Sequence, residues 1–138
     1  PLAALLTCSG ANEGWATYVE QLSYFYDNGL SEENSAYQAA MRSFSLCFHS
    51  LLDIGINYDG WSKDRAAAFV RTCFDADDAL VEELWQTMID NPANYPEYAG
   101  GYVEIMEMRR KQKKSWGTDF PRRNSISFFS ISVLCRFL

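Results

Sequence analysis

Apolar residues recur three and four positions apart along most of the first 115 residues, the spacing of side chains on one face of an α-helix. Short runs of Gly, Pro, Asn and Asp interrupt this spacing and mark the ends of the helices. Strand signals are weak before residue 121. The pattern therefore predicts an all-α fold of about five helices, over residues 12–27, 31–54, 62–74, 75–89 and 96–115.

Capping residues indicate where three of these helices begin, and a proline marks the start of a fourth. Ser31 and Ser62 are residue types that favour an N-cap, and either Asp75 or Asp77 is expected to cap the fourth helix. Pro96 fits the first turn of the last helix, where the missing N–H is not needed.

Two segments rich in Gly and Asn are predicted to interrupt the helices. Gly29 suits a left-handed cap after the first helix. Residues 53–61 hold two Gly and one Asn, which favour a break. Between these segments, the second helix is expected to be long and mostly buried through its large apolar residues Tyr37, Met41, Phe44, Leu46, Phe48, Leu51 and Leu52.

Composition narrows the class of protein. Of the 138 residues, 48% are hydrophobic and 15% aromatic, which indicates a folded domain with a real core. The net charge of -6 argues against a nucleic-acid-binding role, because such proteins need a basic surface. The one basic run, residues 109–114, lies at the end of a predicted helix and complements the helix dipole.

The four cysteines, at 8, 47, 73 and 135, form no Cys-x-x-Cys pair. Reduced, mostly buried thiols in a cytoplasmic protein are therefore expected. No secretory signal or membrane span is visible in the sequence. Because the chain begins at Pro1 without an initiator Met, an upstream signal stays open.

Three blocks of sequence resemble, in order, the bacterial family called domain of unknown function 885. Residues 12–20, NEGWATYVE, resemble its EGWAxYxE signature. Residues 53–62 resemble its D-x-G-(I/L)-(H/N)-x-x-G-W-(S/T) turn. Residues 92–109 resemble its P-x-x-x-x-x-Y-x-x-G-x-x-x-I-x-x-x-R segment. Three ordered blocks are far more specific than any one of them alone.

The resemblance implies a zinc metallopeptidase-like protein of the kind that carries His-Glu-x-x-His on one helix and a third ligand, Glu, on a later helix. Two His one turn apart face the same side, and the third ligand of a catalytic zinc comes from another helix. The resemblance makes Glu13 that metal ligand. Glu20, two turns further on the same face, would orient a ligating His through a hydrogen bond.

The sequence departs from the family at the metal site, because it holds one histidine, His49, and no His-Glu-x-x-His. The resemblance places that motif upstream of residue 1. His49 itself is expected to be a packed or surface residue rather than a ligand. Asn57 stands where many members have His, so its catalytic role would be reduced to donating a hydrogen bond from its amide.

Tyr98 and Arg109 are the other candidate site residues. Peptidases of this kind often use a Tyr to donate a hydrogen bond to the oxyanion, which is the role predicted for Tyr98. Arg109 would bind a substrate carboxylate through its guanidinium. The alternatives are that Tyr98 is a core residue and that Arg109 pairs with Glu13 or Glu20. Trp15, Trp61 and Trp85 are expected in the core.

Residues 121–138 differ from the helical domain expected over residues 1–120, because they alternate Ser with apolar residues as a strand does. Codons can be chosen for residues 122–138 so that the same DNA, read two bases later, encodes a different peptide. That peptide is Lys-Lys-Phe-His-Gln-Phe-Leu-Leu-Asp-Ile-Gly-Pro-Val-Pro-Phe. This is similar to the ending that the family resemblance implies. The tail is therefore interpreted as the product of a frameshift near codon 122, which sequencing of the source DNA decides.

These observations lead to two hypotheses of function. The first is a fragment of a zinc-dependent peptidase, inactive alone, whose intact parent binds zinc and a peptide substrate. The second is a non-enzymatic helical interaction domain. A third arrangement, in which a separate polypeptide supplies the missing helix, links the two. Whether the chain is an enzyme stays open. No nucleic-acid or membrane partner is expected, whereas a homo-oligomer is expected through an exposed face around Trp15 and Tyr18.

Overall fold

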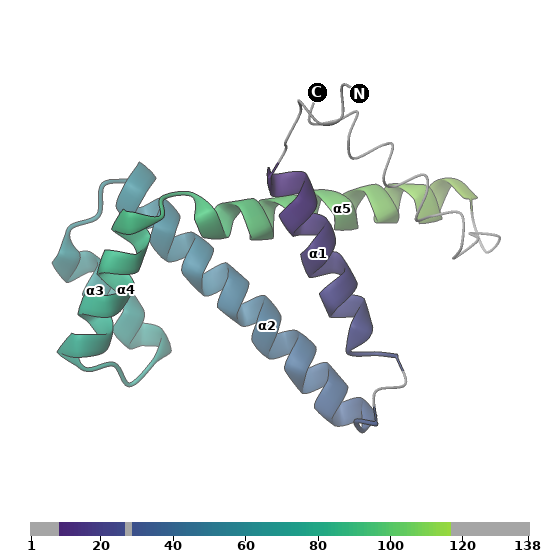
Figure 1. The fold of residues 1–138 in the computed structure, drawn as a ribbon, viewed down its shortest axis with the longest axis horizontal. Helices are drawn as coiled ribbons and strands as arrows, with labels where there is room; N and C mark the ends of the chain where they lie inside the picture. The colour runs from purple at the N-terminus through teal and green to yellow at the C-terminus, as the bar shows by residue number, and fades with distance from the viewer. Residues whose placement is uncertain (1–8, 27–28, 117–138) are drawn as a thin grey trace. The chain divides into compact units, whose positions relative to one another are not determined.

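The computed structural model describes residues 9–26 and 29–116, which are all-helical, as predicted (Figure 1). The described part of the chain contains five α-helices and one short π-helix. In chain order these are α1 (Ser9–Ser23), α2 (Glu32–Asp53), η2 (Ile54–Tyr58), α3 (Lys63–Cys73), α4 (Asp78–Asp90) and α5 (Asn94–Trp116). No strand occurs within these residues. The strand-like tail lies outside them.

The predicted N-caps are confirmed. Ser62 Oγ accepts a hydrogen bond from the backbone N–H of Arg65 at 3.3 Å, at the start of α3. Asp77, rather than Asp75, caps α4 by accepting from the N–H of Leu80 at 2.9 Å. At the start of α2, Ser31 Oγ accepts from the N–H of Asn34 at 3.2 Å. Each cap satisfies a backbone donor that the first helical turn leaves unpaired.

The first helix begins and ends earlier than predicted, at Ser9 and Ser23. It ends at Ser23, where a turn takes over with hydrogen bonds from the Phe25 N–H to Leu22 O (3.1 Å) and from the Tyr26 N–H to Ser23 O (3.2 Å). Phe25 and Tyr26 were expected on its apolar face, but they are 60% and 68% exposed. They fall outside the helical register, which is why the periodic pattern misplaces them.

The predicted break over residues 53–61 is also wrong in part, because the helix continues through residues 54–58 in the wider π form. The backbone N–H of Asp59 donates to Ile54 O, five residues back, at 2.9 Å. The chain turns only at Gly60, whose φ of 68° lies in the left-handed region. Gly29, with a φ of 77°, is left-handed as predicted.

The chain groups into two compact units. Unit 1 consists of the residues up to Ala36 and from Glu97 onward, and unit 2 consists of Tyr37–Pro96. Unit 2 has a core of eight buried residues: Phe48, Leu52, Ile56, Ala66, Ala67, Val70, Val81 and Met88. Trp85 and Tyr95 pack against it. Unit 1 has a smaller core of Ala11, Tyr18, Ile105 and Met108, against which Trp15 packs.

The expectation that α2 is mostly buried is wrong for four of its seven large apolar residues. Leu46, Phe48 and Leu52 are buried, whereas Tyr37, Met41, Phe44 and Leu51 are between 41% and 62% exposed. Cys47 is a free, exposed thiol rather than a buried one. The sequence pattern identified an apolar helix, but it did not show which of its apolar residues are buried.

Candidate functional site

The glycines of two of the sequence blocks meet where α1 and α5 cross in unit 1 (Figure 1). A Cβ built on Gly101 would overlap the carbonyl oxygen of Gly10 and lie 2.9 Å from the Cα of Gly14. A Cβ on Gly14 would likewise overlap the backbone of Gly101. The two helices therefore touch backbone to backbone, which only residues without a side chain permit.

Glu13 lies at this crossing, directly before Gly14 and three residues after Gly10. Its side chain is half-buried. Its backbone carbonyl accepts a hydrogen bond from Thr17 Oγ1 at 2.8 Å, and Thr17 is itself buried. Among the described residues, no hydrogen bond or ion pair of the Glu13 carboxylate is found. The crossing thus fixes the backbone of Glu13 while leaving its two oxygens available.

Glu20 lies seven residues after Glu13, on the same face of α1. Its Oε1 accepts a hydrogen bond from the hydroxyl of Tyr24 at 3.0 Å. Its role as a partner of a ligating His stays a prediction.

Arg109 reaches from α5 to α1. Its guanidinium carbon lies 5.6 Å from the centre of the Tyr18 ring, within the range of a cation–π contact. Burial raises the pKa of Tyr18 and of Tyr102, and the positive charge of Arg109 opposes this rise at both. No ion pair of Arg109 with Glu13 or Glu20 is found within the described residues. Tyr18 is 6% exposed, and the oligomer through the face around Trp15 and Tyr18 stays a prediction.

Tyr98 stands one helical turn before Gly101 on α5, and its side chain is half-buried. Its position places it on the stretch of α5 that runs up to the crossing. The adjacent residue Glu97 lies close to α1, because its carbonyl oxygen would be 3.7 Å from a Cβ on Gly10. Tyr98 and Glu13 are thus carried by the two helices that meet at this point.

Asn57 uses its amide hydrogens within unit 2. Its Nδ2 donates to Asp53 Oδ1 at 2.8 Å and to the carbonyl oxygen of Met88 at 2.9 Å. An amide nitrogen carries only two hydrogens, so donation to a substrate would require one of these bonds to break. In this geometry Asn57 ties η2 to α4.

Asp53 has a structural role that the sequence did not predict. It is 1% exposed, and its Oδ1 accepts from both Asn57 and the backbone N–H of Ala93 at 3.1 Å. Ala93 has a φ of 66°, a strained conformation for a residue with a side chain. Its place as the first residue of the D-x-G block was the available signal, but nothing in that block indicated a contact forty residues away.

The other residues of the D-x-G block also have structural roles. A Cβ on Gly55 would come within 2.5 Å of the Trp61 ring, so only glycine fits beneath the indole. Arg65 covers that ring, with its guanidinium carbon 4.6 Å from the centre. Asp53 Oδ2 and Trp61 Nε1 are both buried without a hydrogen-bond partner. The block therefore builds a rigid turn rather than an open site.

His49, expected to be a packed or a surface residue, is half-buried and packed. Its Nδ1 lies 2.7 Å from the carbonyl oxygen of Ser45, and its ring stacks on Tyr95 with 4.5 Å between centres. Within residues 9–26 and 29–116, no three His, Cys, Asp or Glu side chains gather closely enough to hold a metal ion. None of the described helices is both long and apolar enough to cross a membrane.

These features define an all-helical protein in which three separate sequence blocks form the helix crossing and the buried turn. The sequence model of one family, described as "Bacterial protein of unknown function (DUF885)", matches residues 2–124. The chain belongs to this family. The comparison with curated proteins and the comparison with solved structures each gave no significant match.

Proposed function

We propose that this chain is part of a zinc-dependent peptidase-like protein, to which it contributes one metal ligand, Glu13, and substrate-site residues on α5. The observation that carries the proposal is the position of Glu13 at the Gly14–Gly101 crossing, with a half-buried carboxylate that has no partner among the described residues. The glycine contact holds the backbone of Glu13 in a fixed position against α5, as a metal ligand requires.

The donor set of the described residues fits one zinc ligand and not a complete site. A catalytic zinc takes three protein ligands and keeps one position open, and no group of three is found in the described ranges. The two other ligands belong, by this proposal, to a His-Glu-x-x-His helix outside this chain. When bound in the complete site, zinc polarises a water or a carbonyl oxygen.

The residues on α5 have roles that follow from their chemistry. Tyr98 donates a hydrogen bond from its hydroxyl to an oxygen that gains negative charge during the reaction. Arg109 holds a carboxylate of the peptide, since its guanidinium is anchored over Tyr18 without an ion pair to Glu13 or Glu20. Glu20 orients a ligating His. Asn57, by contrast, supports the fold through its bonds to Asp53 and Met88.

Zinc analysis tests the proposal. The chain alone should hold well under one zinc per molecule after gel filtration. Co-expression with the His-Glu-x-x-His segment of a longer family member should raise this to about one, together with chelator-sensitive peptidase activity. Glu13→Gln should lower the zinc affinity of that complex at least tenfold, because it removes a charged ligand. Glu83→Gln, an exposed carboxylate of α4, serves as the matched control and should change nothing.

Two results would overturn the proposal. One is stoichiometric zinc in the isolated chain, which would mean that the site does not depend on an outside helix. The other is a complex in which Glu13→Gln binds zinc as tightly as the unmodified chain.

The second candidate function is a non-enzymatic helical interaction domain. The observation that favours it is the set of exposed apolar residues on α2. A helix face that contacts only water usually carries polar residues at such positions.

A further inference from the structure

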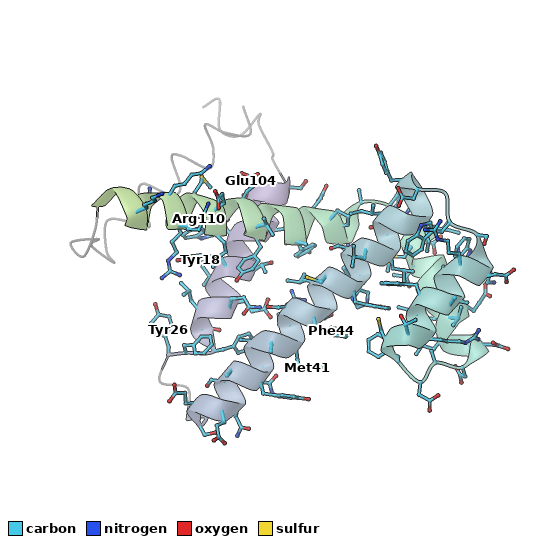
Figure 2. The ribbon with its side chains drawn as sticks, turned by 180° about the vertical axis from the view of Figure 1, so that it is seen from behind. Tyr18, Tyr26, Met41, Phe44, Glu104 and Arg110 are labelled. Carbon is cyan, nitrogen blue, oxygen red and sulfur yellow. The ribbon has the colours of Figure 1, made fainter. Side chains whose placement is uncertain are left out.

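A groove lies along the middle of α5 in unit 1. It has a volume of about 550 Å³ and is lined by Tyr102, Val103, Met106, Glu107, Arg109 and Arg110. We call it the α5 groove. Figure 2 labels Arg110 on α5 and Tyr18 on the neighbouring α1. Pockets for small ligands commonly measure roughly 300 to 1,000 Å³, so the α5 groove can hold a large side chain and not only an ion.

Most of the surface of the α5 groove is apolar. Val103 and Met106 are 62% and 38% exposed, although both side chains are apolar. Tyr102 is half-buried and packs against the core of unit 1, so one part of the groove belongs to the folded core. Apolar side chains that line a hollow together with a few polar groups are typical of a binding site.

The two arginines of the α5 groove differ in their partners. Arg110 donates to both carboxylate oxygens of Glu107 at 2.8 Å, and Glu107 also pairs with Lys111 at 3.4 Å. Arg109 is half-buried and lies against the Tyr18 ring, and within residues 9–26 and 29–116 it pairs with no carboxylate. Its guanidinium therefore keeps N–H donors in the planar fork that matches a carboxylate. The charge of the groove favours an anionic ligand at Arg109.

The hydroxyl of Tyr102 adds a second donor. Tyr102 and Arg109 are seven residues apart, so they lie on the same side of α5. The positive charge of Arg109 opposes the rise that burial causes in the pKa of Tyr102, which shows that the two groups act on each other. In the part of the chain that the structure describes, the Tyr102 hydroxyl has no hydrogen bond. A guanidinium and a hydroxyl together suit the end of a peptide, which offers amide groups beside its carboxylate, better than a fatty acid, which offers the carboxylate alone.

We propose that the α5 groove binds the C-terminal residue of a peptide, with its α-carboxylate on Arg109 and a large apolar side chain against Val103 and Met106. This inference deepens the proposed peptidase function and rests on it for the claim that the peptide is a substrate. Gly101, at the helix crossing beside Glu13, precedes Arg109 by eight residues, which is about 12 Å along the helix axis. An extended peptide covers about 3.3 Å per residue, so a ligand of about four residues reaches from Arg109 to the crossing.

Calorimetric titration of the full chain, without added metal, tests the groove with the N-acetylated peptide Ala-Ala-Ala-Phe. We expect a dissociation constant of about 1 mM or lower. The same peptide with a C-terminal amide, and the peptide that ends in Gly instead of Phe, should each bind at least tenfold more weakly. Arg109→Gln should reduce the affinity for the acid to that for the amide and leave the affinity for the amide unchanged. Val103→Ser, at an exposed position, should weaken the binding of acid and amide alike.

Lys114→Gln is the matched control, because it removes an equal charge from an exposed residue of α5 outside the groove lining. It should change the affinity less than twofold. A loss as large as that of Arg109→Gln would overturn the proposal, since the basic end of the helix would then attract anions in general. Equal binding of acid and amide, no binding at all, or tighter binding of octanoate than of the peptide would also overturn it. The zinc affinity of Glu13→Gln is measured separately, so a failure there would remove the peptidase role and leave the peptide-binding groove standing.

Discussion

Unit 2 packs large side chains around Phe48 and Met88, whereas unit 1 brings α1 and α5 together at two glycines. In unit 2 the contacts between helices are mostly contacts between side chains, supported by N-caps and by the bonds of Asp53. In unit 1 the central contact is between backbones. The small core of Ala11, Tyr18, Ile105 and Met108 surrounds that contact and cannot replace it.

The two arrangements differ in what damages them. A core of large side chains loses stability when atoms are removed, because a cavity remains. A backbone crossing loses stability when atoms are added, because there is no side chain that could move aside. Unit 1 is thus expected to be sensitive to the smallest added group, and unit 2 to the loss of buried polar atoms.

The largest effect is expected for Gly101→Ala. The added methyl group would overlap the carbonyl oxygen of Gly10, which is backbone and cannot yield without separating α1 from α5. We expect a loss of about 3 kcal/mol or more in the free energy of unfolding, measured by urea titration followed by circular dichroism.

Gly100→Ala is the matched control, one residue away on the same helix. A Cβ at Gly100 meets nothing within 4 Å. Because alanine favours the helix more than glycine does, this variant should be more stable by up to about 1 kcal/mol. Equal effects of the two substitutions would show that helix propensity, and not the crossing, governs unit 1.

The next effect concerns unit 2 and the carboxylate of Asp53. Asp53→Ala leaves the Ala93 N–H and one Asn57 hydrogen without their acceptor in a buried place, which should cost about 2–3 kcal/mol in the free energy of unfolding. Asp53→Asn keeps the accepting oxygen and changes only the position of Oδ2, which has no partner. Its cost should be smaller, about 1 kcal/mol.

Urea unfolding of both variants decides between a role of the accepting oxygen and a role of the charge. If Asp53→Asn proves as destabilising as Asp53→Ala, the negative charge itself holds the turn, and the hydrogen-bond account of unit 2 is wrong. Asp90→Ala, at an exposed carboxylate at the end of α4, controls for a general effect of removing an acid.

Local parts of the fold could be read from the sequence. The caps at Ser31 and Ser62 and the first-turn position of Pro96 depend on a few neighbouring residues and are found as predicted. Of the two predicted caps of the fourth helix, Asp75 and Asp77, the structure has Asp77. The failures are non-local. The helical pattern could not show which face of α2 meets a core, because periodicity reports an apolar face and not its partner.

The candidate site shows the same difference between local features, which the sequence predicts, and contacts between distant residues, which it does not. Glu13, Glu20, Tyr98 and Arg109 were identified by family resemblance, and the structure places the four of them on α1 and α5 within unit 1. Neither the Gly14–Gly101 contact nor the bond from Ala93 to Asp53 was predicted, since each joins residues distant in sequence. The pattern of one sequence does not show which distant residues lie close together in space.

The smallest effect is expected from pH, and it again separates the units. Burial is the largest cause that raises the pKa of Tyr18 and Tyr102 above 10.0, and both lie in unit 1. A raised folded pKa means that the unfolded chain releases these protons first. Their contribution to stability is therefore present below pH 10 and is lost as the pH rises through the folded values.

Urea unfolding between pH 8 and 11 tests this effect, because these values span about one to two units around that pKa. The free energy of unfolding should fall at the alkaline end. The fall should be shallower in Tyr18→Phe, which has no phenol to ionise at that position. An unchanged slope in this variant would mean that the Tyr18 ring is as well solvated in the folded chain as in the unfolded one, and that the core of unit 1 is looser than its contacts with α5 indicate.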